Sequence, residues 1–155
     1  GNQYYAMVSP VMIDAKNPLY SVNGVFNAIF IHGNVLGDAM FYGSGAGKLP
    51  TASAVVADVV DCAKNKGRNI MMSWSEEKLD LLQIDDVKSR FFVRVSGHAA
   101  ERQNEIEELF GKVEIVAVPS LSEEFAFITG EITEQEYREK AEKLDGIQSR
   151  IRARI

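Results

Sequence analysis

The sequence holds a single cysteine, Cys62, and only two histidines, His32 and His98, among its 155 residues. One cysteine cannot form an internal disulfide, and no charged start followed by an apolar core marks a secretory signal. The two histidines are far apart, with no second His or Cys at metal-ligand spacing. These absences predict no metal site and favour a reducing, cytoplasmic setting.

Long apolar runs and clustered positive charge are also missing. The longest apolar stretches, residues 25–31 and 52–60, fall well short of the ~20 residues that a membrane span needs. Acidic side chains outnumber basic ones by 22 to 17, which gives a net charge of -5. Non-specific binding to nucleic acid or anionic lipid needs clustered positive charge. The composition therefore predicts neither a membrane span nor a nucleic-acid partner.

Charge is scarce in the first part of the chain. Residues 1–65 carry seven charged side chains, whereas residues 66–155 carry 32. A segment of that size with so few charges has too little polar surface to stand alone in water. We therefore expect two parts, the first packed against something else or self-associating through strand edges and apolar faces. The chain also begins with Gly1 and soon enters an apolar run, like a piece of a longer polypeptide.

The pattern of residues 1–67 predicts a partial antiparallel or mixed sheet with a return helix. Residues 4–13 favour an edge or bent strand, because Pro10 cannot donate to a ladder. Residues 25–32 and 38–42 are strand-like and flank a glycine-bounded loop of hairpin length. A helix is expected over residues 52–63, where valines recur at spacings of three and four and Pro50 suits the first turn.

The second part predicts a ferredoxin-like order of elements. Residues 91–95 alternate as a strand, and a helix follows over 100–110. Strands are expected over 113–118 and 125–132, and Thr133 with Glu136 has capping-box spacing before another helix. In the last strand Arg150, Arg152 and Arg154 alternate with apolar residues and predict a solvated outer face. The order βαββαβ gives an α+β chain with domains at 1–67 and 88–155, joined by a connector at 68–87.

A glycine-rich loop at residues 43–47 joins the predicted hairpin to the first helix. Glycine allows the backbone to approach a phosphate or a planar ring closely, and the following helix offers unpaired amides. The spacing does not fit a phosphate-binding Walker loop, because Leu49 follows Lys48 and Tyr42 stands where the first glycine belongs. It does not fit a dinucleotide fingerprint either. A ligand-binding loop and a tight strand-to-helix turn both remain open.

Other chemistry-bearing residues are less informative. Asp58 and Asp61 are three apart on the predicted helix, where solvent-facing carboxylates are the simpler interpretation. Cys62 has no nearby histidine and is expected to be a buried, inert thiol. We assign no catalytic residue and no metal ligand.

Four stretches together resemble homoserine dehydrogenase. Residues 8–14 with Asn17-Pro18-Leu19, residues 23–32, and residues 43–53 continuing into Asp58-Val59-Val60 are similar to the C-terminal end of that family's catalytic part. Residues 84–94 resemble the entry into the regulatory ACT domain that many bacterial members carry. The resemblance spans nearly the whole chain.

The resemblance implies an NAD(P)-dependent oxidoreductase that interconverts L-aspartate semialdehyde and L-homoserine, on the route to threonine and methionine. In the family the dinucleotide domain, the catalytic lysine and the acidic substrate residues lie N-terminal to such a segment. Neither Lys16 nor Lys48 matches that lysine's motif, so this chain alone is expected to be inactive, with no cofactor bound. What remains of the site is the glycine loop, which in the family closes on the cofactor. The candidate cofactor-binding residues are Gly47, Gly45 and Ala46.

The resemblance further implies a homo-oligomer and an ACT-like domain with threonine as the expected effector. ACT domains commonly bind an amino acid at a loop reading roughly Asp-x-x-Gly-Val-Leu. Residues 96–103 stand there in this chain, without the aspartate and with only Gly97 as a flexible position. A dimerisation module whose sheets pair side by side remains open, and so does a stand-alone amino-acid-sensing module without catalytic role. An RNA-binding domain of similar topology would need a basic surface, which this acidic chain lacks.

Overall fold

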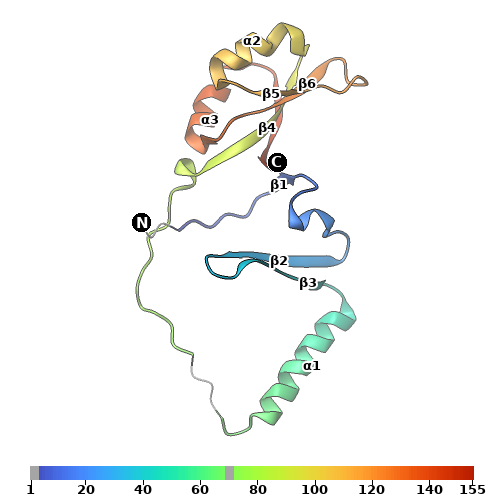
Figure 1. The fold of residues 1–155 in the computed structure, drawn as a ribbon, viewed down its shortest axis with the longest axis vertical. Coiled ribbons are helices and arrows are strands. Elements are labelled where there is room, and N and C mark those ends of the chain that lie inside the picture. The colour runs from blue at the N-terminus through green and yellow to red at the C-terminus, as the bar shows by residue number, and fades with distance from the viewer. Residues whose placement is uncertain (1–3, 69–71) are drawn as a thin grey trace. The chain divides into compact units, whose positions relative to one another are not determined.

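The structure is a computed structural model that describes residues 4–68 and 72–155, and it divides into two compact units (Figure 1). One unit joins Gly1–Asp14 with Lys78–Ile155, and the other is Ala15–Glu77. The predicted connector includes residues 69–71, which lie outside the described part of the chain. The domain boundaries expected at residues 67 and 88 stay a prediction.

The first unit is an α+β arrangement, as the sequence predicts. Its elements from residue 88 onward run strand, helix, two strands, a two-residue strand, helix, strand. The strands are β1 (Val11–Ile13), β4 (Lys88–Ser96), β5 (Glu114–Val116), β6 (Glu124–Ile128), β7 (Ile132–Thr133) and β8 (Ile147–Arg154). The helices are α2 (Ala99–Phe110), α3 (Glu134–Ala141) and the short 3-10 turn η2 (Ile84–Asp86).

The sheet of this unit runs in the order β1-β8-β4-β6-β5, with β7 pairing separately to β4. β4 is antiparallel to β6 and β8, whereas β1 runs parallel to β8. β1 is therefore an edge strand, as expected for a segment interrupted by Pro10. The sequence did not indicate which sheet it would join, because no local pattern records a pairing with residues 152–154.

The core lies between one face of β4 and β6 and the helices α2 and α3. Phe91, Val93 and Val95 of β4 are wholly buried, as their alternation predicts. They cluster with residues of the two helices and of β6, among them Ile106, Phe110, Phe127 and Tyr137. Burying each such side chain contributes about 1.5–3 kcal/mol. The Phe91 and Tyr137 rings lie 4.5 Å apart between centroids, so α3 packs directly on β4 through this aromatic pair.

The arginines of β8 correct the sequence interpretation. Arg152 pairs across the ladder with Phe91, and Arg150 pairs with Val93. Both arginines therefore share the face of the core residues rather than a solvated outer face. Glu134, at the start of α3, contacts both guanidinium groups and is itself buried. The sequence predicts the alternation along β8 correctly. The side on which the arginines lie depends on the carboxylate of Glu134, which belongs to α3.

The second unit contains the predicted hairpin and helix. β2 (Phe26–Gly33) and β3 (Gly37–Ser44) pair in antiparallel register, after a 3-10 turn η1 (Pro18–Ser21). α1 (Lys48–Lys64) begins four residues before the expected start, with Pro50 in its first turn. No residue of α1 is buried, and Val55, Val56 and Val59 are each more than half exposed. Cys62 is also exposed, so its expected burial is wrong for the described structure.

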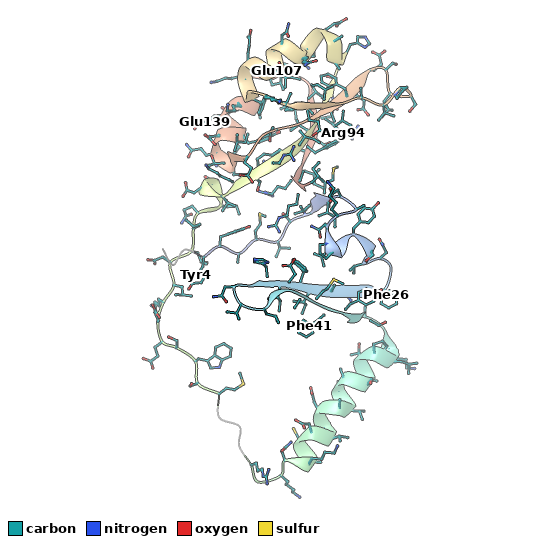
Figure 2. All side chains as sticks on the ribbon, viewed as in Figure 1. Tyr4, Phe26, Phe41, Arg94, Glu107 and Glu139 are labelled. Carbon is teal, nitrogen blue, oxygen red and sulfur yellow. The ribbon has the colours of Figure 1, made fainter. Side chains whose placement is uncertain are left out.

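The hairpin likewise exposes large apolar side chains. Ile29 and Phe41 are exposed by 66% and 65%, and Figure 2 shows side chains standing along both strands. Phe26 stacks on Tyr42 across the ladder with ring centroids 5.0 Å apart. A hairpin and one helix with so little burial cannot supply a core of their own. Among the described helices, none is long and apolar enough to cross a bilayer.

Candidate functional site

The glycine loop lies between the end of β3 and the start of α1. Gly47 is the residue before the first turn of α1 and has a φ of +121°, which side chains of L-residues rarely adopt. A Cβ added to Gly47 would also lie 3.5 Å from Cδ of Pro50. Backbone conformation therefore accounts for glycine at this position.

Gly45 is fixed by a different constraint. A Cβ on Gly45 would lie 2.2 Å from Nδ2 of Asn27, closer than atoms can approach. Asn27 belongs to β2, where it pairs with Gly43 of β3. The amide side chain therefore lies against the backbone of the loop. Asn27 was part of the resemblance, but only the register of the hairpin reveals this contact.

The start of α1 leaves backbone donors available. No side chain caps the helix, and its first turn holds no acidic residue. The amide of Thr51 bonds to the Gly47 carbonyl at 3.1 Å, whereas the amides of a helix's first residues have no partner within the helix. These amides and the helix dipole favour an anionic group, and residues 43–47 are exposed. Together with the missing Cβ atoms, they suit a phosphate-bearing cofactor lying on the loop.

Other titratable groups of this unit have structural roles. His32 Nδ1 lies 2.5 Å from Asp38 Oδ1 across the hairpin, and both side chains are well exposed. Asp61 accepts a hydrogen bond from Nδ2 of Asn65 at the end of α1. Asp58 contributes to no cluster, because no group of three metal-ligating side chains occurs in residues 4–68 and 72–155. The absence of catalytic residues from this chain stays a prediction.

The turn after β4 is the second candidate. Gly97 has a φ of +104°, and Nη1 of Arg102 donates to the Ser96 carbonyl at 3.0 Å. The hydroxyl of Ser96 donates to the Gly146 carbonyl at 3.3 Å, so the turn is tied to the start of β8. A cavity of about 370 Å³ opens beside it. Its lining residues are Ser96, Ser120, Leu121, Ser122, Glu123, Glu124 and Gln148.

Residues 2–60 match the family model described as homoserine dehydrogenase. The chain is 42% identical over 94 residues to the homoserine dehydrogenase of Lactococcus lactis, covering 59% of this chain and 22% of that protein. It is 54% identical over 61 residues to the homoserine dehydrogenase of Corynebacterium glutamicum, covering 39% of this chain and 14% of that protein. The chain therefore spans about a fifth or less of the length of these curated relatives.

Solved structures of homoserine dehydrogenases share the fold over more of the chain. A homoserine dehydrogenase of Thiobacillus denitrificans matches with a TM-score of 0.72 at 24% identity, over 94% of this chain and 38% of that chain. A homoserine dehydrogenase of S. aureus, solved at pH 7.0, matches with a TM-score of 0.68 at 25% identity, over 94% of this chain and 37% of that chain. These matches confirm the resemblance to the C-terminal part of homoserine dehydrogenase.

Proposed function

We propose that this chain is the C-terminal part of a homoserine dehydrogenase, an NAD(P)-dependent oxidoreductase that interconverts L-aspartate semialdehyde and L-homoserine in threonine and methionine biosynthesis. The match of residues 2–60 to the family carries this proposal, because it includes the glycine loop. The curated relatives are several times longer than the matched segment. The substrate lysine and the nucleotide domain belong to the part of the enzyme that precedes these residues.

The glycine loop is the contribution of this chain to the cofactor site. Gly47, Gly45 and Ala46 would lie against the bound cofactor, with the free amides at the start of α1 facing a phosphate group. When bound, the nicotinamide supplies the hydride chemistry. The chain's own residues bind and orient: Asn27 lies against the loop at Gly45, and the positive φ of Gly47 leads the backbone into the helix. Neither Lys16 nor Lys48 matches the motif of the family's catalytic lysine, so we expect the chain alone to be inactive.

The unit around β4 is an ACT-like regulatory domain in this proposal. Its strand order β8-β4-β6-β5, with α2 and α3 packed on one face, supports a ferredoxin-like arrangement. The cavity beside Ser96 and Gly97 is where an amino-acid effector such as threonine would bind. A stand-alone amino-acid-sensing module would explain this unit equally well. It leaves the glycine loop and the match of residues 2–60 without a role.

The exposed apolar surface of the second unit supports a homo-oligomer, and the single cysteine fits a cytoplasmic setting. The hairpin and α1 present isoleucine, phenylalanine and valine side chains to solvent, and both edges of the hairpin lack a third strand among the described residues. Such surfaces are typical of buried interfaces. We assign them to the preceding part of the enzyme and to a second copy of the chain.

A chimera tests the proposed function. Residues 2–60 replace the matching segment of the Lactococcus lactis enzyme, and NADPH oxidation with L-aspartate semialdehyde is measured. The proposal predicts turnover within about tenfold of the parent, whereas the 155-residue chain alone gives none. A chimera that folds and assembles but is inactive would contradict it, and so would turnover by the isolated chain.

Calorimetric titration with threonine, methionine and lysine tests the regulatory part separately. A threonine-specific signal that is lost on substitution of Gln148 by Leu in the cavity supports effector binding. The matched control is Gln103→Leu on α2, which pairs with Glu107 away from the cavity. Silence with all three amino acids favours a dimerisation module.

A further inference from the structure

A second cavity lies where β1 begins beside β8, and two arginines line it. Its volume is about 200 Å³, and its lining residues are Pro10, Phe91, Arg150, Ile151 and Arg152. The β1 to β8 ladder starts only at Val11 and Arg152. Because Pro10 cannot donate to a ladder, the edge of β8 before Arg152 has no strand partner among the described residues. All of these residues belong to one compact unit.

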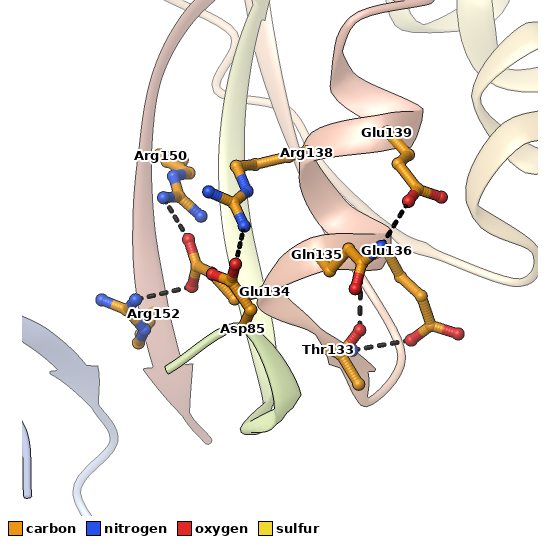
Figure 3. Close-up of polar contacts among 9 residues, drawn as sticks. All are labelled: Asp85, Thr133, Glu134, Gln135, Glu136, Arg138, Glu139, Arg150 and Arg152. Atoms are coloured by element: carbon orange, nitrogen blue, oxygen red, sulfur yellow. Dashed lines mark hydrogen bonds and ion pairs between the residues drawn. The ribbon is translucent and has the colours of Figure 1, made fainter. Parts of the chain in front are cut away.

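The two guanidinium groups are held in place and already share one carboxylate. Figure 3 shows Glu134 between them, with Oε1 on Arg150 and Oε2 on Arg152, the latter at 2.5 Å. Arg150 also stacks over the Tyr137 and Phe91 rings, its Cζ lying 4.6 Å and 5.3 Å from their centroids. Stacked and paired guanidinium groups lose little further entropy when they bind a ligand. The positions of both guanidinium groups are therefore set before any ligand binds.

Donors and charge remain after Glu134 is bound. Each guanidinium has five N–H donors, and Glu134 engages one nitrogen of each. Two cations against one carboxylate leave one net positive charge at the cavity. The neighbouring Asp85 and Arg138 neutralise each other at 2.5 Å and do not change this balance. Arg90, by contrast, donates to the carbonyls of Thr129 and Ile155 besides pairing with Glu114, and has little left to offer.

We propose that this cavity is a binding site for a small carboxylate ligand, held by Arg150 and Arg152 beside Pro10, and separate from the effector loop after β4. The ligand would share the guanidinium groups of Arg150 and Arg152 with the carboxylate of Glu134. The Glu134 carboxylate already lies between the two guanidinium groups, and charge-assisted pairing of this kind is how arginine recognises carboxylates. Occupation of the cavity also ties the start of β1 to β8. Since the chain enters the second unit at Ala15, directly after β1, the ligand would steady the strand that precedes one of the two crossings between the units.

Malonate is the probe, titrated by calorimetry into the full chain. We expect saturable binding that weakens at least about tenfold in Arg152→Gln and strengthens in Glu134→Gln, because the substituted amide no longer competes as an anion. Hydrogen exchange of Val11–Ile13 should slow when malonate is bound. Arg94→Gln is the matched control: Arg94 pairs with Glu124 at 2.7 Å and does not line this cavity, so binding should be unchanged.

The proposal is overturned if malonate does not saturate, if Arg152→Gln binds like the unaltered chain, or if inorganic phosphate binds as tightly as malonate. Circular dichroism checks that each variant is folded. If Arg152→Gln does not fold, Arg150→Lys replaces it. Arg150→Lys keeps the positive charge but loses the planar guanidinium group, so the affinity for malonate should still fall. An unchanged affinity for malonate would contradict the proposal. The titration needs neither cofactor nor substrate, so its outcome is independent of the chimera.

Discussion

Thr133 and Glu136 show how much a short motif can determine. The Thr133 hydroxyl accepts from the Glu136 amide at 3.1 Å, and the Glu136 carboxylate accepts from the Thr133 amide at 2.7 Å (Figure 3). Both bonds were expected from the three-residue spacing, because both partners are local. Asn27 and Gly45 are the opposite case: their contact requires the hairpin register, which single residues do not encode.

Thr133→Ala should cost about 1 kcal/mol of unfolding free energy, because α3 loses its N-terminal cap. The hydrogen bonds from Thr133, first from its backbone, hold the pKa of Glu136 below its usual 4.5. Because the pKa of Glu136 is lower in the folded chain, its ionised form stabilises the fold at pH values above its pKa in the unfolded chain. This stabilisation is lost as the pH falls through its pKa in the folded chain. Urea unfolding at neutral and acidic pH should therefore show a smaller acid loss in Thr133→Ala. Ser122→Ala, on an exposed loop, is the control, and an equal acid loss in both would contradict this explanation.

Tyr137 should ionise at a higher pH in the folded chain than in the unfolded chain. Burial raises the pKa of its phenol above 10.0, and the nearby Arg150 offsets part of this rise. Because the pKa of Tyr137 is higher in the folded chain, its protonated phenol stabilises the fold at pH values below its pKa in the unfolded chain. This stabilisation is lost as the pH rises through its pKa in the folded chain. Tyrosinate absorbance of the folded chain should show a late phase that is absent when the chain is unfolded in denaturant. Tyr137→Phe should remove the late phase; a single phase in the folded chain would contradict the assignment.

At the scale of elements, prediction succeeded where an element's own pattern meets a core. β4 alternates and its inward residues are buried, because β6, α2 and α3 cover that face. In α1 the helical spacing was correct, yet the valine face is uncovered in the described structure. In β8 the alternation was correct and the face was wrong, because Glu134 draws Arg150 and Arg152 to the helix side. Periodicity gives the element, and its partners give the orientation.

Substitutions in the two units should therefore differ sharply in cost. Ile106→Ala removes a wholly buried side chain of α2 and should cost about 2–5 kcal/mol. Val55→Ala on α1, 58% exposed, should change the unfolding free energy by no more than about 0.5 kcal/mol. Chemical denaturation followed by circular dichroism measures both. A comparable loss in the two variants would mean that α1 is covered in the isolated chain.

At the scale of the whole molecule, the division of the chain was only partly visible in the sequence. The scarcity of charge in residues 1–65 indicated a segment that needs a partner surface. It could not show that residues up to Asp14 would form a compact unit with the C-terminal residues, because the β1 to β8 pairing is made across most of the chain. Long-range pairings of this kind leave no local signal.

Self-association should follow from the exposed apolar faces of the second unit. Light scattering of the chain at high micromolar concentration should give at least the mass of two chains. Replacing Ile29 and Phe41 by Lys should shift the distribution toward the monomer, since both side chains are exposed in one hairpin. Replacing Glu107 by Lys on α2 changes charge without touching the hairpin and is the control. A clean monomer of the unaltered chain would count against the interface.

The central claim is that the glycine loop lies against the cofactor, and the cofactor KM of the chimera tests it most directly. Gly47→Ala should raise the KM for NADPH by about tenfold or more, because the backbone can no longer hold its φ of +121°. Gly24→Ala also places an L-residue at a positive φ, +66°, but outside the loop and with open space around its Cβ, and it should leave that KM unchanged. Equal KM values for NADPH in the Gly47 and Gly24 variants would contradict the account.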